Sequence, residues 1–190
     1  DEHFEALAYH YAGVRNKEKT AYYAELAGDK AMAAMALDRA RMQYRTALEA
    51  LDAMGETAEG FERWNLIAQN YGWSCVFDPS ADQPELLRRA VDIARELADQ
   101  ESIAKAEYWL GYIYYSLGKS ALAIYHCEKS LELARELNDE THMVHVRLTI
   151  AQAKASACDY DSALQDFHEI MEIKRRYRKK STPSVTSAYS

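Results

Sequence analysis

The chain has 190 residues, of which 30 are acidic and 23 are basic, so its net charge near neutral pH is −7. It contains only seven glycines and three prolines, a composition that favours helices over sheets. The length is enough to bury a substantial core. No apolar run approaches the roughly 20 residues that a membrane-spanning helix needs, so we expect no membrane association.

The three cysteines are Cys75, Cys127 and Cys158; they cannot all pair, and none lies in a C-x-x-C motif. Free thiols in a reducing compartment are the simpler explanation, and we therefore expect a cytoplasmic protein. The sequence begins at Asp1 rather than Met and shows no signal peptide. We expect a fragment of a longer protein or a processed chain.

The spacing of apolar residues predicts about nine helices in a single domain over residues 1–180. An extra helix over residues 2–14 precedes four helix pairs, at about 18–54, 59–99, 102–137 and 141–178. Gly28 falls inside the first helix of the first pair, where a glycine costs only about 1 kcal/mol, so we expect that helix to continue through it. Residues 77–84 contain two prolines and form the loop within the second pair. Residues 181–190 are small and polar, and we expect a disordered tail there.

A pattern of small and aromatic residues recurs along the chain. In its clearest copy Gly111 is followed by Tyr114, by a break at Gly118 and then by Ala123. Gly111 and Ala123 lack bulk where two antiparallel helices would cross, and Gly118 permits a tight reversal between them. The small residues that correspond in the four pairs are Gly28, Ala68, Gly111 and Ala151, which lie 40, 43 and 40 residues apart.

This pattern resembles the tetratricopeptide repeat in its long form of about 40 residues, over about residues 20–178. The resemblance implies a right-handed superhelix of antiparallel helix pairs, which is an α-solenoid. Proteins of this kind use their repeats to bind other proteins or peptides.

A second resemblance covers the N-terminal third of the chain. The elements that carry it are L-A-x-H-Y at Leu7–Tyr11, E-K at Glu18-Lys19, L-A-G at Leu26–Gly28 and A-L-E-A-L at Ala47–Leu51. Together they resemble the start of the helical C-terminal region of bacterial adenylate/guanylate cyclase–ATPase multidomain signalling proteins. This implies a regulatory or scaffold segment of a larger bacterial signalling protein, with any cyclase or ATPase domain outside these residues.

In tetratricopeptide repeats the first helix of each pair lines a concave groove, and the resemblance implies a peptide-binding groove here. The predicted groove residues are Asn65, Gln69, Trp73, Lys105, Tyr108, Tyr112, Tyr115, His145 and Gln152. The same predicted face includes Tyr22, Glu25, Asp29, Met32, Glu62, Leu148 and Ser156. Amide side chains can bond the main chain of a peptide, and tyrosines offer rigid contact area with a polar tip. We expect the groove to bind an extended peptide or a helix with modest sequence specificity.

Two alternatives stay open for this surface. The aromatic face could join two copies in a homodimer or larger assembly that has no separate ligand, or the repeats could hold a small-molecule effector. A clamp for a C-terminal carboxylate is disfavoured, because Asn65 and Gln69 stand where a lysine and an asparagine are needed. Only Lys105 has the right charge for such a clamp.

The sequence offers no convincing chemical site. His142 and His145 lie three residues apart on one predicted helix, and His126 and Cys127 lie on the helix before it. No carboxylate or second cysteine is spaced to complete a zinc site with them. No local motif suggests a nucleophile with its base, so we expect no enzyme activity and no metal or cofactor within this chain.

Six of the 23 basic residues gather at the end of the last predicted helix: Lys174, Arg175, Arg176, Arg178, Lys179 and Lys180. Cations near a helix C-terminus interact favourably with its dipole, which accounts for about two or three of these charges. Residues 1–173 hold the other 17 basic residues and all 30 acidic ones, a net charge of −13. This acidic body argues against nucleic acid as the main partner. We expect the basic cluster to contact an acidic surface, such as the body of a neighbouring copy.

Overall fold

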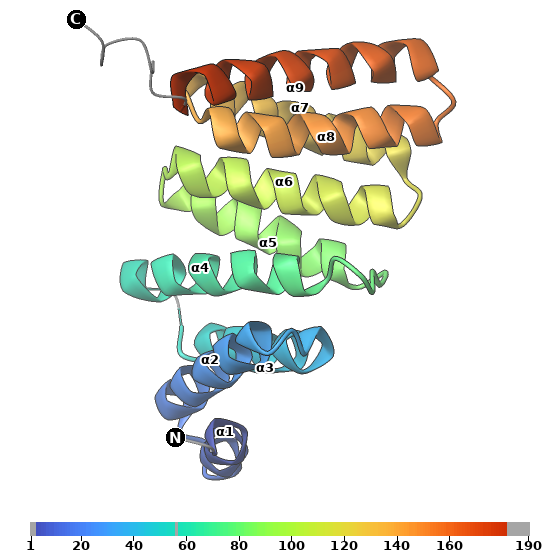
Figure 1. Ribbon diagram of the computed structural model, residues 1–190. Coiled ribbons are helices and arrows are strands. Elements are labelled where there is room, and N and C mark those ends of the chain that lie inside the picture. Colours follow the sequence, from blue (N-terminus) through green and yellow to red (C-terminus); the bar gives the residue numbers. More distant parts are fainter. Residues whose placement is uncertain (1–2, 56, 182–190) are drawn as a thin grey trace, which may run out of the picture.

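The computed structural model describes residues 3–55 and 57–181, and of residues 58 and 177–181 it describes the backbone only. The described residues form nine α-helices and no strand, which confirms the predicted all-α fold (Figure 1). The helices are α1 (Phe4–Gly13), α2 (Lys17–Ala33), α3 (Leu37–Asp52), α4 (Ala58–Ser74), α5 (Gln83–Glu96), α6 (Gln100–Ser116), α7 (Ser120–Glu136), α8 (Glu140–Ser156) and α9 (Tyr160–Ser181). The predicted tail lies outside the described residues except for Ser181, which ends α9.

The helices stack as antiparallel pairs along one direction (Figure 1). α1 packs on α2, and the pairs α2–α3, α4–α5, α6–α7 and α8–α9 follow. Each pair contacts the next through its second helix, because α3 touches α4, α5 touches α6, and α7 touches α8. The first helices of the last three pairs also touch, α4 with α6 and α6 with α8. This arrangement is an α-solenoid.

Most joints between helices use one type of turn. A single residue with positive φ follows the preceding helix, and the next residue donates a backbone hydrogen bond five positions back, as in Lys119 N to Tyr114 O at 2.8 Å. Gly118 holds this place with φ 72°. At other joints Arg15, Met35, Ala98, Asn138 and Cys158 hold it, so the turn recurs without a glycine signal. The α4–α5 joint is different, since residues 75–82 form a longer connection and Pro84 stands in the first turn of α5.

Two glycines allow close crossing within pairs, as the pattern predicts. A Cβ atom added at Gly111 would lie 2.5 Å from the Cys127 sulfur and 3.1 Å from the Ala123 carbonyl oxygen. A Cβ added at Gly28 would lie 2.5 Å from the Tyr44 ring, and α2 continues through Gly28 without a break. The side chains across each crossing therefore fill the space that a methyl group would need.

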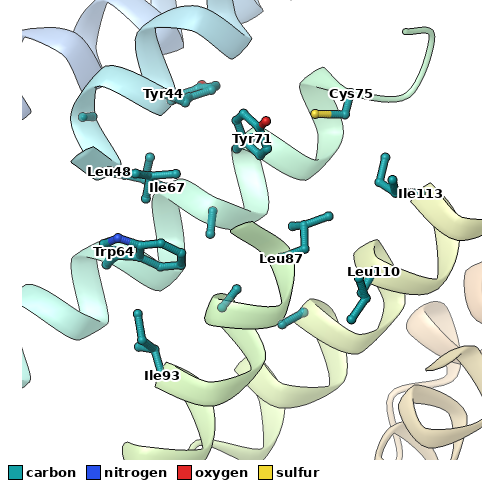
Figure 2. Packing of buried hydrophobic residues seen from close by; sticks show 14 of the residues in the cluster. Tyr44, Leu48, Trp64, Ile67, Tyr71, Cys75, Leu87, Ile93, Leu110 and Ile113 are labelled. Carbon is teal, nitrogen blue, oxygen red and sulfur yellow. The ribbon is translucent and has the colours of Figure 1, made fainter. Parts of the chain in front are cut away.

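One hydrophobic core runs through the middle of the stack (Figure 2). Tyr44 and Leu48 of α3 meet Trp64 and Ile67 of α4, and the cluster continues through α5 to α6 (Figure 2). No single pair buries its own apolar faces, which is why the repeats need neighbours. Among the described residues, no helix combines the length and apolarity needed to cross a bilayer.

Candidate peptide-binding surface

Four aromatic side chains form a contiguous row on α6, which we call the aromatic ladder: Tyr108, Trp109, Tyr112 and Tyr115. Their ring centroids are separated by 5.0 Å for Tyr108–Trp109, 6.0 Å for Trp109–Tyr112, and 6.2 Å for Tyr112–Tyr115. These distances, with tilted and edge-on rings, are typical of favourable aromatic pairs. All four side chains are partly buried, so each still presents an edge to solvent.

The ladder is held from the α4 side by a glycine. A Cβ added at Gly72 would lie 2.7 Å from the Trp109 ring, so the indole packs directly on the α4 backbone. On the exposed side of α4, Leu66 and Trp73 are exposed and Gln69 is partly exposed. Residues 66, 69 and 73 lie one helical turn apart and therefore share a face of α4. Leu66 was missed in the sequence analysis.

The ladder is held from the α8 side by His142. The ring centroids of Tyr108 and His142 lie 5.4 Å apart in an edge-on arrangement. His142 Nε2 lies 2.9 Å from the Ser130 hydroxyl oxygen, and that hydroxyl donates to the Ala104 carbonyl at 2.7 Å. His145 and Leu148 are exposed on α8, and Gln152 is partly exposed.

These side chains make a continuous surface because α4, α6 and α8 lie side by side (Figure 1). We call it the tyrosine face and define it by the ladder together with Leu66, Gln69, Trp73, His145, Leu148 and Gln152. It faces away from α5 and α7, which pack on the other side of these helices (Figure 1). Seven of the nine predicted groove residues thus lie on one surface with their side chains at least partly accessible.

The two remaining predicted groove residues, Asn65 and Lys105, are less available to a ligand than predicted. Asn65 is only 2% exposed, and neither its Nδ2 nor its Oδ1 atom has a hydrogen-bond partner among the described residues. A ligand on the tyrosine face would not reach it. Lys105 is partly exposed, but its Nζ atom is bonded to Glu101 at 2.5 Å. Its charge is thus partly neutralised within α6.

Burial raises the pKa of two tyrosine hydroxyls of the ladder. It raises the pKa of Tyr108 to about 12 and raises the pKa of Tyr112 as well, since both phenols lose water on the α6 surface. Burial also lowers the pKa of His142, so the ring beside Tyr108 is neutral at physiological pH. The surface therefore offers uncharged donors and acceptors around aromatic rings.

The corresponding positions of α2 lie outside this surface. Asp29 accepts a hydrogen bond from the Tyr44 hydroxyl at 2.8 Å, and Glu25 forms an ion pair with Arg63 of α4 at 2.6 Å. These two carboxylates stabilise the first pair and its contact with α4. Tyr22 is exposed on the same helix.

A buried carboxylate that the sequence analysis missed lies on the opposite side of α6. The Glu107 side chain is 2% exposed and lies 2.9 Å from Arg95 of α5 and 2.6 Å from the His126 Nδ1 atom of α7. The spacing of residues in the sequence could have revealed this burial, because Glu107 lies on the same buried face of α6 as Ala104 and Gly111. It ties three helices together behind the ladder.

The basic cluster lies at the free end of the stack. Lys174, Arg175 and Arg176 are exposed on α9, and Arg175 pairs with Glu172 at 2.7 Å. The side chains of Arg178, Lys179 and Lys180 lie outside the described residues. Within the part of the chain that the structure describes, no group of three or more His, Cys, Asp or Glu side chains could hold a metal ion.

The tetratricopeptide repeat family model matches residues 102–176, which lie in α6 to α9. No curated protein matches the chain. Among solved structures, the crystal structure of MamA protein is 19% identical over 88% of this chain and 99% of that one, with a TM-score of 0.47. The crystal structure of BtubC (BKLC) from P. vanneervenii is 15% identical over 100% of this chain and 98% of that one, with a TM-score of 0.43. The matched residues include the helix that carries the ladder, and tetratricopeptide repeats generally mediate contacts between proteins.

Proposed function

We propose that the chain binds a peptide segment of a partner protein on the tyrosine face. The observation that carries the proposal is the aromatic ladder, which is fixed between Gly72 of α4 and His142 of α8 and stays partly accessible. Rigid aromatic side chains contribute large contact areas at a low cost in conformational entropy, and they are enriched among residues that dominate binding energies.

Each part of the surface has a distinct role in the proposed complex. Tyr112, Tyr115 and Trp73 act as apolar anchors for side chains of the peptide. Gln69 and Gln152 lie on the two flanking helices, where their amides can donate to and accept from the peptide main chain. Because these contacts involve main-chain groups and aromatic rings, we expect modest sequence specificity.

The proposal is tested by selecting binders from a displayed library of random peptides and measuring their affinities by calorimetry. The variant Trp73→Ala/Tyr112→Ala should weaken binding by about tenfold or more, since each anchor contributes more than about 1 kcal/mol. The matched control is Leu122→Ala/Tyr125→Ala, which removes one exposed aliphatic and one exposed aromatic side chain from α7. Equal affinities for both variants would reject the tyrosine face as the binding surface.

The second sequence resemblance supports a proposal for the setting of this module. The motifs between residues 7 and 51 support a place for this module in a larger cytoplasmic signalling protein of bacteria, of the cyclase–ATPase type. An antibody against the chain should then detect, in lysate of the source cell, a polypeptide far larger than 21.7 kDa. Detection of a band near 21.7 kDa alone would reject that setting and leave the binding proposal unaffected.

A further inference from the structure

A second surface lies on the other side of the stack, in a cleft between α3 and α5 with a volume of about 600 Å³. We call it the α3–α5 cleft. Five apolar residues line its floor, of which Phe61 and Leu86 are partly exposed, whereas Leu48, Trp64 and Ile93 are buried beneath them. Figure 2 shows Leu48, Trp64 and Ile93 on three successive helices at this place. Trp64 is buried, and its Nε1 donor has no hydrogen-bond partner among the described residues.

The rim of the α3–α5 cleft is acidic. It carries six carboxylates, Glu49, Asp52, Asp82, Glu85, Asp92 and Glu96, against three guanidinium groups, Arg45, Arg88 and Arg89, for a net charge of −3. Two ion pairs span the cleft, Arg45–Asp82 at 2.5 Å and Arg89–Asp52 at 2.7 Å. Glu49, Glu85 and Glu96 are exposed and have no ion-pair partner among the described side chains. An apolar floor with an unneutralised acidic rim suits an amphipathic, basic segment.

The same chain carries such a segment on α9. Met171 is 50% exposed, whereas the residues at the same repeat position, Leu131 of α7 and Val91 of α5, are 5% and 4% exposed. The following helix covers those two residues, as α8 does for Leu131. No described helix covers Met171. Leu164, seven residues earlier on the same side of α9, is exposed as well.

The positive charge of Lys174 limits which kind of surface can pack on this side of α9. Lys174 stands at the repeat position that Ala134 and Ala94 hold in α7 and α5, where both alanines are fully buried. Another helix of the same stack would therefore have to bury an ammonium group against its backbone, which is unfavourable without a carboxylate partner. The acidic rim of the α3–α5 cleft supplies such carboxylates, and Lys174 and Arg175 lie within about 60° of Met171 around the helix.

We propose that the basic end of α9 from one copy of the chain docks in the α3–α5 cleft of a second copy. The two surfaces lie at different levels of one stack, with α6, α7 and α8 between them, so they cannot meet within a single chain (Figure 1). Met171 and Leu164 contact Phe61 and Leu86 at the floor of the cleft. Lys174 and Arg175 pair with Glu49, Glu85 and Glu96. This self-association is independent of peptide binding on the tyrosine face.

The test is analytical ultracentrifugation of the full chain over a range of concentrations, at low and at high salt. The mass should rise above 21.7 kDa with concentration at low salt and return toward it at high salt, because exposed charge pairs are screened. The variants Lys174→Glu/Arg175→Glu and Glu49→Lys/Glu85→Lys should each weaken association by about tenfold or more, and an equimolar mixture of the two should restore it. Restoration in the mixture also shows that both variants fold.

The control is Glu128→Lys/Glu136→Lys, which makes the same charge change at exposed positions of α7 and should leave association unchanged. A chain that stays monomeric at all concentrations and salts would overturn the proposal. Association that neither reversal weakens, or that the mixture fails to restore, would overturn it too. Loss of association in the Trp73→Ala/Tyr112→Ala variant would instead place the contact on the tyrosine face.

Discussion

The α6–α7 pair and the α4–α5 pair occupy equivalent places in the stack but are built differently. α6 and α7 pack along their whole length, with Gly111 against Ala123 and Cys127. α4 and α5 contact each other much less, because residues 75–82 form a longer connection and α5 is shorter. The family match covers α6 and α7 but neither helix of the earlier pair.

The two pairs also differ in how well their buried polar groups are hydrogen-bonded. In the α6–α7 pair Glu107 has Arg95 and His126 as partners, and Ser130 bonds the Ala104 carbonyl. In α4 the Trp64 Nε1 atom and both amide atoms of Asn65 lack partners among the described residues. Unsatisfied buried polar groups are costly, so we expect the α6–α7 pair to contribute more stability than the α4–α5 pair.

The largest expected effect comes from removing Glu107. The change Glu107→Ala removes a buried carboxylate that bonds Arg95 and His126 and leaves a cavity. It should lower the free energy of unfolding by about 3 kcal/mol, because hydrogen bonds to charged groups and buried side-chain volume are both lost. The control Glu101→Ala removes an exposed carboxylate of the same helix, paired with Lys105, and should cost less than about 0.5 kcal/mol. Urea unfolding of both variants measures the two values. Similar small losses would show that Glu107 does not tie the three helices together.

The crossing of α6 and α7 gives the next largest effect. In Gly111→Ala the new methyl group would meet the Cys127 sulfur and the backbone of Ala123, so unfolding should become easier by about 2 kcal/mol, which is typical of an overpacked core. Gly13→Ala adds a methyl group with no atom within 4 Å at the end of α1 and should be neutral or slightly stabilising. Thermal melting of the two variants compares them. A stable Gly111→Ala protein would contradict the close crossing.

In the α4–α5 pair, a substitution of a buried residue should raise stability instead of lowering it. Asn65→Leu replaces an unsatisfied buried amide by the side chain that α8 carries at the same repeat position, Leu148, and should stabilise the chain by about 1–2 kcal/mol. Asn70→Leu, at a partly exposed position of the same helix, should change stability by less than about 0.5 kcal/mol. Destabilisation by Asn65→Leu would show that the buried amide has a partner in solution.

The smallest effect concerns acid sensitivity at the junction of α6, α7 and α8. Burial lowers the pKa of His142 in the folded chain. As the pH falls, His142 is therefore protonated in the unfolded chain, near the ordinary pKa of about 6.5, before it is protonated in the folded chain. Folding stability contributed by the neutral ring is therefore present above that pH and is lost as the pH falls through the lowered pKa. His142→Gln should lose less stability between pH 7 and acid than the wild type, whereas His168→Gln, at an exposed site on α9, should behave like the wild type. An equal acid response in His142→Gln and the wild type would contradict this.

The sequence predicted those features that depend on residue size and spacing. Gly28 and Gly111 were found because a close helix crossing needs small residues at a fixed period. On α4 the predicted face included Asn65, but Leu66 is the exposed residue. A period of 3.6 fits spacings of both three and four residues, so the pattern alone does not fix the rotation of a helix.

Other features depend on groups that are distant in the sequence. The position of Glu107 places it on a buried helix face, but its partners Arg95 and His126 come from two other helices and cannot be identified from the local sequence. The recurring turn with positive φ is held by Ala98 and Cys158 as well as by glycine, so no residue type announces it. The α3–α5 cleft follows from sparse packing of α4 on α5, which no local pattern encodes.

Site-specific photocrosslinking tests the binding surface most directly. A photoreactive amino acid would replace Leu66 or Leu148 on the tyrosine face, or Leu122 on α7, three leucines that are all exposed. A selected peptide should crosslink to the chain from positions 66 and 148 and not from position 122. Crosslinks from position 122 alone would contradict the assignment of the tyrosine face and move the binding surface to the opposite side of the stack.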